Sequence, residues 1–529
     1  SNFGNFDIPS GAILHTEEEH DDHDEDHEGD HEEEDLGYLN NSDNESQSGK
    51  FGLSKAGDWG YVGISFGKIE SLYGIPFHGE GHEAHGGHGH DDHDEDEHEG
   101  EEEHEEEHEE GSHSDERIFS STDSEILNLE GSQILGDGWL KQIDYNFRNT
   151  DYTLTEQHAE EEDTHGDEEE HDDHHSEGPT AFENEAREYG AIFDLSNDSF
   201  SQKFVVNFIE EDLSIIGAES YMNPSENEEL TLGYYFSKDF EAVHLDFGVR
   251  HDRINRKGSI SVKETHDEDH DEDHDEDHDE DHDEDHDEHE HEEGHVETTA
   301  YDRDINNTSF ALSLSRDFTE SLDATLSFSS VERAPSAVEL YMNGPHLATG
   351  RLEVGNANLE SEKANNLDFT LNFERDGFFG SFTYFRNDVD NYIYLMDETE
   401  EEHEEHEEEG EHHGGLILAN YLQKDAELSG YEIEIGKVFT LNKGDLSLSF
   451  ARDSVDGEFS DGSNIPRMDP DRNIYSVSYA YDDLAVALKL KDVQEQDEIG
   501  LNETVTADYQ MLNLNLSKTF DLTDSNQLN

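Results

Sequence analysis

Hydrophobic and polar residues alternate with a period of two through much of the chain. Segment 61–69 (YVGISFGKI) places Val62, Ile64 and Phe66 on one face, and glycine or serine on the other. A period of two predicts β-strands whose two faces meet different surroundings. The same alternation recurs in segments 309–318, 367–376, 445–454, 473–483, 486–492 and 511–520.

The connections between these predicted strands are of two kinds, very short and long, and the two kinds alternate along the chain. We count about seventeen strands of roughly 10 to 18 residues joined in this way. An antiparallel sheet of that size curls, and closure removes its edges. A β-propeller would show a repeating blade motif, and a soluble sandwich would not sort its loops by length. The pattern therefore predicts an all-β fold, an antiparallel up-and-down transmembrane β-barrel.

The composition is acidic, with a formal net charge of −111 over 529 residues, 30% hydrophobic residues and a mean hydropathy of −1.00. Such values indicate disorder when they hold along a whole chain. Here the acid is concentrated with histidine in blocks, which we expect to be disordered outer loops of the barrel. The charge excludes nucleic acid as a partner. There is no cysteine, and no apolar run is long enough for a transmembrane helix. The blocks are 17–35, 78–113, 158–175, 264–295 and 398–413.

Histidine recurs at every fourth position of the run HDEDHDEDHDEDHDEDHDEDH, from His266 to His286. Imidazole and carboxylate together favour divalent transition metals such as zinc, copper and nickel. A merely solvated acidic surface would not require histidine at regular intervals. We therefore predict metal capture by His266, His270, His274, His278, His282 and His286. The glycine-rich loop after Tyr73 adds the candidates His78, His82, His85, His88 and His90.

Residues 329–395 resemble the core signature of TonB-dependent outer-membrane receptors. The similar elements are Arg-Ala-Pro at 333–335, Glu-Leu-Tyr at 339–341 and Gly-Asn-x-Asn-Leu at 355–359. Within that family, NGPHLATG at 343–350 and the acid–histidine loops resemble the zinc-uptake subgroup. The resemblance implies a 22-stranded barrel filled by an N-terminal plug that contacts an energy-coupling protein.

The resemblance also implies ordered metal ligands inside the barrel, namely His346 and, by a looser match, Glu219. His244 alternates with Val243 and Leu245 on a predicted strand, which would turn its side chain toward the lumen. We expect its role there to be structural rather than metal binding. No plug, coupling motif or closing strand is visible. We therefore expect residues 1–529 to be the receptor barrel, incomplete at both ends.

The predicted function is uptake of a divalent metal ion, Zn²⁺ first, through the outer membrane of a Gram-negative-type bacterium. Loops facing outside would capture the ion, and lumen sites would receive it for TonB-energised transport. The expected partners are the ion, outer-membrane lipid and a TonB-type coupling protein acting through the missing plug, with no nucleic acid. No enzymatic activity or organic cofactor is expected. Two alternatives stay open: the same fold importing nickel, copper, cobalt or a small metal chelate, and a non-transporting surface protein for metal buffering or adhesion.

Overall fold

The fold is a large antiparallel sheet, seen in a computed structural model of the chain. The structure describes residues 2–6, 38–39, 41–75, 118–158, 179–217, 220–263, 296–346, 349–399, 416–523 and 526–528. The strands of its first half are β1 (Asn2–Phe3), β2 (Asn44–Gly57), β3 (Gly60–Gly74), β4 (Ile118–Ile134), β5 (Gln142–His158), β6 (Thr180–Asp194), β7 (Ser201–Ile216), β8 (Ser225–Asp239), β9 (His244–Lys263), β10 (Val296–Thr319) and β11 (Leu322–Arg333).

The second half begins with a short helix, α1 (Ala337–Tyr341), and continues as strands. These are β12 (Asn343–His346), β13 (Arg351–Val354), β14 (Glu362–Arg375), β15 (Phe378–Asp397), β16 (Ile417–Thr440), β17 (Asp445–Phe459), β18 (Arg472–Tyr481), β19 (Leu484–Val493), β20 (Tyr509–Lys518), β21 (Phe520–Thr523) and β22 (Asn526–Leu528). None of the helical segments that the structure describes is long and apolar enough to cross a membrane.

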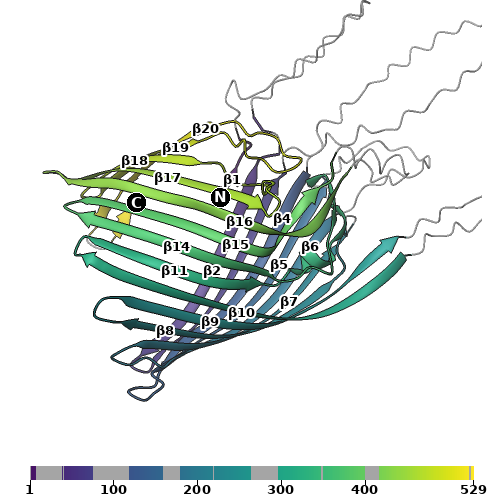
Figure 1. Cartoon of the computed structure of the whole chain (residues 1–529), viewed down its shortest axis with the longest axis horizontal. Coiled ribbons are helices and arrows are strands. Elements are labelled where there is room, and N and C mark those ends of the chain that lie inside the picture. The colour runs from purple at the N-terminus through teal and green to yellow at the C-terminus, as the bar shows by residue number, and fades with distance from the viewer. Residues whose placement is uncertain are drawn as a thin grey trace, which may run out of the picture.

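The barrel wall consists of β2–β11 and β14–β20, each strand pairing antiparallel with its neighbours and β11 pairing directly with β14. These seventeen strands confirm the fold predicted from the alternation, although the longest have 24 residues rather than about 18. Short turns lie at one end of the wall in Figure 1, and the strand ends that border the long connections lie at the other. This separation is typical of outer-membrane barrels, with short periplasmic turns and longer extracellular loops.

The two faces of the wall differ as the sequence pattern predicts. Leu314, Leu326 and Phe369 lie in register on β10, β11 and β14, and all three are exposed. On the opposite face, the hydroxyls of Ser313 and Ser327 lie 3.0 Å apart in a polar row. The apolar row therefore belongs to the outward, lipid-facing surface, and the serine row faces the lumen.

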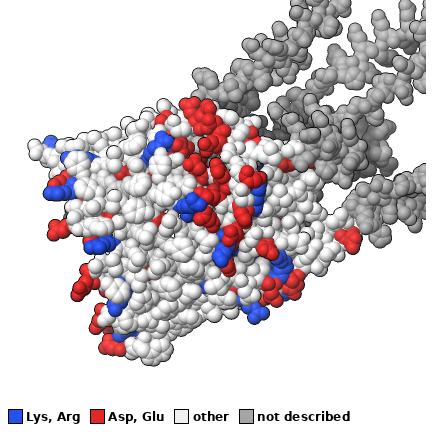
Figure 2. All heavy atoms as spheres, in the orientation of Figure 1, with Lys and Arg blue, Asp and Glu red and all other residues white. Residues whose placement is uncertain are grey.

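Toward the long loops, the same outward face becomes acidic. Figure 2 shows Asp and Glu side chains gathered in a belt across the wall. Carboxylates even face each other in register, as in Glu210 opposite Glu228 and Asp212 opposite Glu226. We call this surface the acidic belt; on β6–β8 and β15–β17 it comprises Glu183, Glu185, Glu210, Asp212, Glu226, Glu228, Asp388, Asp390, Glu427, Asp456 and Glu458.

The described residues between β11 and β14, which are 334–346 and 349–361, fold against the inner face of the wall and form what we call the insert. Ser336 caps α1, whose residues Leu340 and Tyr341 are fully buried. They belong to an apolar core that packs on Phe182 and Leu213 from lumen-facing positions of β6 and β7. Strand β13 also pairs parallel with the start of β16. The insert is thus built into the extracellular half of the barrel.

Two contacts anchor the insert to the wall. Arg333 donates hydrogen bonds to Glu339 of α1 at 3.0 Å and to Glu362 of β14 at 2.5 Å. The Tyr341 hydroxyl donates to a backbone carbonyl of β9 at 3.0 Å, and its ring covers Gly258 so closely that a Cβ there would lie 2.4 Å from it. The sequence motifs at 333–341 therefore have a structural role in fixing α1.

Candidate metal site

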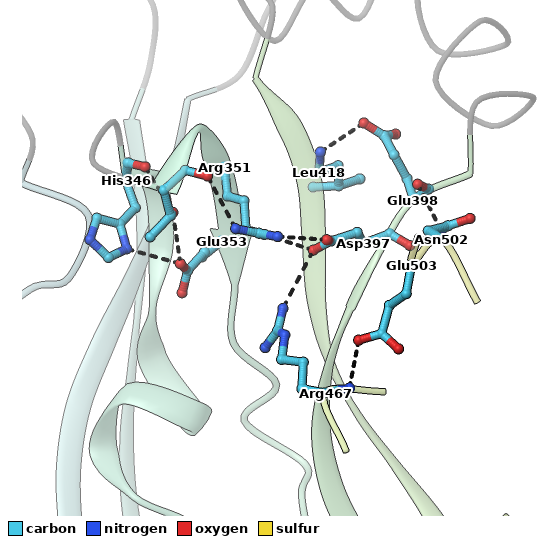
Figure 3. A network of polar contacts seen from close by, with 10 residues as sticks. His346, Arg351, Glu353, Asp397, Glu398, Leu418, Arg467, Asn502 and Glu503 are labelled. Atoms are coloured by element: carbon cyan, nitrogen blue, oxygen red, sulfur yellow. Dashed lines mark hydrogen bonds and ion pairs between the residues drawn. The ribbon is translucent and has the colours of Figure 1, made fainter. Parts of the chain in front are cut away.

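The hairpin of β12 and β13 carries His346 into the lumen. The imidazole Nδ1 of His346 lies 2.9 Å from Oε1 of Glu353 (Figure 3). Thr349 Oγ1 is 3.0 Å from the carbonyl oxygen of His346 and 3.3 Å from the same Glu353 oxygen. The side chain of Glu353 is 6% exposed and that of His346 is 21% exposed. The hairpin therefore presents an ordered imidazole supported by a buried carboxylate.

The Glu353 carboxylate determines what this imidazole can do. Burial raises the pKa of Glu353, but the hydrogen bond and charge of His346, followed by Thr349 and Arg351, outweigh burial and lower it. An ionised Glu353 accepts the Nδ1 proton of His346 and so leaves Nε2 as the basic nitrogen. Among the described residues, no hydrogen bond is made to Nε2. Histidines that bind a metal through one ring nitrogen commonly donate the proton of the other nitrogen to a carboxylate, as His346 does here.

The imidazole also contacts an aromatic side chain next to the wall. The Tyr221 ring stacks on His346 with ring centroids 4.9 Å apart, and it contacts the Phe182 ring of β6 in a tilted arrangement at 5.8 Å. The backbone of Tyr221 accepts a hydrogen bond from Asn343 at 2.7 Å. His346 is thereby placed beside the extracellular end of the wall strand β6.

A network of charges ties the hairpin to the rest of the extracellular surface (Figure 3). Arg351 donates two hydrogen bonds to Asp397 at the end of β15, at 2.8 and 2.7 Å. Arg467, from the connection after β17, lies 3.9 Å from the same carboxylate. Asn502, from the connection after β19, donates to the backbone carbonyl of Asp397 at 2.8 Å. Positive and negative groups thus alternate from His346 outward to the surface loops.

Of the residues predicted as metal ligands, His346 is the one that the structure describes. Glu219 lies outside the described residues, as do the predicted ligands at 78–90 and 266–286. His244 faces the lumen at the opposite rim, where its nitrogens lie 2.6 Å from Asp239 and 3.1 Å from Asp246.

Sequence reasoning missed Glu353. It sits diagonally across the hairpin from His346, because Arg351 is the direct partner of His346 in the register. A sequence prediction that paired His346 with Arg351 in a hairpin would have placed the side chains of His346 and Glu353 on the same face. Within the described part of the chain, no group of three or more His, Asp or Glu side chains could hold one metal ion.

Comparisons with known proteins agree with this architecture. The family model described as TonB dependent receptor-like, beta-barrel, matches residues 91–529. The chain is similar in fold to the copper transporter OprC, with a TM-score of 0.64, 13% identity, and coverage of 92% of this chain and 67% of that chain. It is also similar to a double mutant of the Serratia marcescens hemophore receptor HasR, solved with its hemophore HasA and heme, with a TM-score of 0.59, 12% identity, and coverage of 92% and 67%.

A third similar structure is the ferric-catecholate import receptor Fiu from E. coli K12, with a TM-score of 0.56, 12% identity, and coverage of 92% of this chain and 69% of that chain. The chain thus spans about two thirds of the length of each of these structures. At such low identities the likeness concerns the fold.

Proposed function

Because this chain belongs to the TonB-dependent receptor β-barrel family of outer-membrane proteins, we propose that it takes up a divalent metal ion, with Zn²⁺ as the main cargo. The observation that carries the proposal is the pair of His346 and Glu353 at 2.9 Å, on an insert that lies in the lumen. The Nε2 of His346, for which the described residues provide no hydrogen-bond partner, is a suitable zinc ligand. The buried carboxylate behind it fixes the orientation of the ring.

The acid–histidine blocks extend this proposal to capture of the ion. They contain most of the 36 histidines of the chain and most of its excess negative charge. A strongly negative entrance raises the local concentration of cations and speeds their association. The blocks would therefore concentrate dilute Zn²⁺, and the lumen site would select it. Onward passage would depend on the energy-coupling protein that serves this family.

The test is a Zn²⁺ titration of the full receptor in competition with a fluorescent chelator. We expect His346→Ala to weaken the tightest site by roughly ten- to a hundredfold. Deletion of 264–295 is expected to remove weak sites and leave that one intact. The matched control is His251→Ala, since His251 bonds Thr308 at 2.9 Å on the outward face. A tight site unaffected by His346→Ala would refute the proposed role of this residue.

Copper is the second candidate cargo, because imidazole and carboxylate sites generally bind Cu²⁺ more tightly than Zn²⁺. The similar fold of the copper transporter OprC is compatible with either metal. Uptake of each metal at equal free-ion concentration, by cells with and without a functional coupling protein, separates the cargoes. It also separates import from surface buffering, since buffering would not depend on energy coupling.

A further inference from the structure

Glu156 occupies a lumen-facing position at the extracellular end of β5. Phe147 on the same strand lies in register with Leu129 and Tyr189 in the outward apolar band. Glu156 is nine residues further along and on the opposite face, about 30 Å from Phe147 along the strand at the spacing of β-structure. It is therefore a carboxylate of the inner mouth of the barrel, outside the lipid-facing part of the wall.

Glu156 lies in a polar row across three strands, opposite Ser120 on β4 and Thr180 on β6. Ser120 is completely buried, yet its hydroxyl has no hydrogen-bond partner among the described residues. Leaving a buried hydroxyl unpaired costs about 1–3 kcal/mol. Directly opposed side chains in an antiparallel pair have Cβ atoms roughly 5 Å apart. The unpaired Ser120 hydroxyl therefore adjoins Glu156, where a polar ligand would satisfy it.

The same row leads to His346. Phe182 follows Thr180 by two residues on the lumen face of β6, and its ring contacts Tyr221, which stacks on the imidazole of His346. Burial raises the pKa of Glu156, and the charge of His346 acts in the opposite direction, so the two groups lie within electrostatic range. The wall and the hairpin thus bring an imidazole and a carboxylate to one place, with Glu353 supporting the imidazole.

We propose that Glu156 is the wall-side ligand of the cation that His346 holds from the hairpin, an inference that rests on the proposed function. A divalent transition metal accepts both the Nε2 of His346 and a Glu156 oxygen. Water would complete the coordination shell, and the Ser120 hydroxyl is placed to bond one such water. A site with two protein ligands, one on the wall and one on the hairpin, suits a cargo that must be released again.

The experiment compares Glu156→Gln, His346→Ala and the double variant in the full receptor, by Zn²⁺ competition with a chelator. Glu156→Gln should weaken the tight site by roughly tenfold or more. The double variant should bind no worse than His346→Ala alone, because two ligands of one ion lose their effects together. Glu156→Asp should restore part of the affinity. The matched control is Glu185→Gln, which removes the same charge from the outward face of β6.

The outcomes separate the two proposals. If His346→Ala abolishes the tight site while Glu156→Gln behaves like Glu185→Gln, the role of Glu156 is refuted and the proposed function stands. Strictly additive losses would also refute it, because they would indicate a distant charge effect. If neither His346→Ala nor Glu156→Gln alters binding, both proposals fail. Unchanged melting temperatures of the variants establish that the receptor is folded in every comparison.

Discussion

The guanidinium of Arg351 donates a pair of hydrogen bonds to the carboxylate of Asp397, at 2.8 and 2.7 Å, and so ties the lumen hairpin to the end of the wall strand β15. Both side chains are largely buried, with 26% and 20% exposed. Two parallel bonds fix orientation as well as distance. Since Glu353 is two residues from Arg351 on the same strand, the pair also fixes the carboxylate that supports His346.

Replacing Asp397 by Asn should therefore loosen the hairpin without touching its metal-binding groups. Loss of a charged hydrogen-bond acceptor costs roughly 1.5–3 kcal/mol. We expect faster hydrogen exchange in residues 343–354 and a severalfold loss of Zn²⁺ affinity, while His346 and Glu353 remain present. Hydrogen–deuterium exchange with mass spectrometry measures the first effect, and chelator competition measures the second.

Asp388→Asn is the control for this variant. Asp388 bonds Arg386 at 3.0 Å on the outward face, where both side chains are about half exposed. Exposed ion pairs contribute only about 0–1 kcal/mol. Exchange in the hairpin should not change in Asp388→Asn. Equal exchange rates in Asp397→Asn and the unmodified receptor would mean that the parallel pairing of β13 with β16 holds the hairpin by itself.

Gly258 is predicted to be intolerant of a side chain because of Tyr341. A Cβ at this position would lie 2.4 Å from the tyrosine ring, which is fully buried in the core of the insert. Gly258→Ala should displace α1 and destabilise the insert by about 1–3 kcal/mol, as overpacking usually does. Gly248→Ala, on the same strand, meets its nearest atom at 4.0 Å and should be neutral. Limited proteolysis within 334–361 distinguishes the two variants.

The wall could be predicted from the sequence because its signal is local. Alternation such as Leu312, Leu314 and Ser313, Ser315 reports the two environments of a strand directly, and the spacing of the turns gives the topology. The insert has no such period. Its helix and two short strands are fixed by the inner face of the wall, through the buried residues Leu340 and Tyr341. Tertiary contacts of this kind leave no repeat in the sequence.

The candidate site also has one residue that the sequence could identify and two that it could not. His346 was identified through a resemblance to a family motif. Glu353 and Glu156 are two among 141 acidic residues, and nothing in their immediate neighbours sets them apart. Glu353 is distinguished by the fold of one hairpin, and Glu156 by the charge of His346, which is nearly 200 residues away in sequence. These two carboxylates can be singled out only by the residue that each one interacts with, and the sequence does not show that residue before the chain is folded.

The segment between β19 and β20 should loosen as the pH rises. The charge of Asp456, then burial and further carboxylates, raise the pKa of Glu498 above its ordinary value. A raised pKa in the folded state means that the contribution to stability is fully present below the ordinary value of about 4.3 and is lost as the pH rises through the raised value. Glu498→Gln should remove this dependence and stabilise the segment at neutral pH.

Hydrogen exchange in residues 494–508 at several pH values measures this effect. Glu503→Gln serves as the contrast, because Glu503 accepts backbone hydrogen bonds from Arg467 at 2.5 Å and from Gly500 at 2.7 Å. That variant should loosen the segment at neutral pH, where Glu498→Gln tightens it. Faster exchange in both variants would contradict the assignment of repulsion to Glu498.

The acidic belt should limit the stability of the wall, because Glu210 on β7 and Glu228 on β8 face each other in register. Directly opposed like charges destabilise an antiparallel pair, and opposite charges stabilise it by about 0.2–1 kcal/mol. Glu228→Lys should therefore raise the free energy of unfolding measured with urea in detergent micelles. Salt screens exposed charges over about 10 Å at 0.1 M, so the gain should shrink as salt is added. Glu241→Lys changes the net charge equally in the turn before β9. If both variants gained the same stability, the effect would come from net charge rather than from the facing pair.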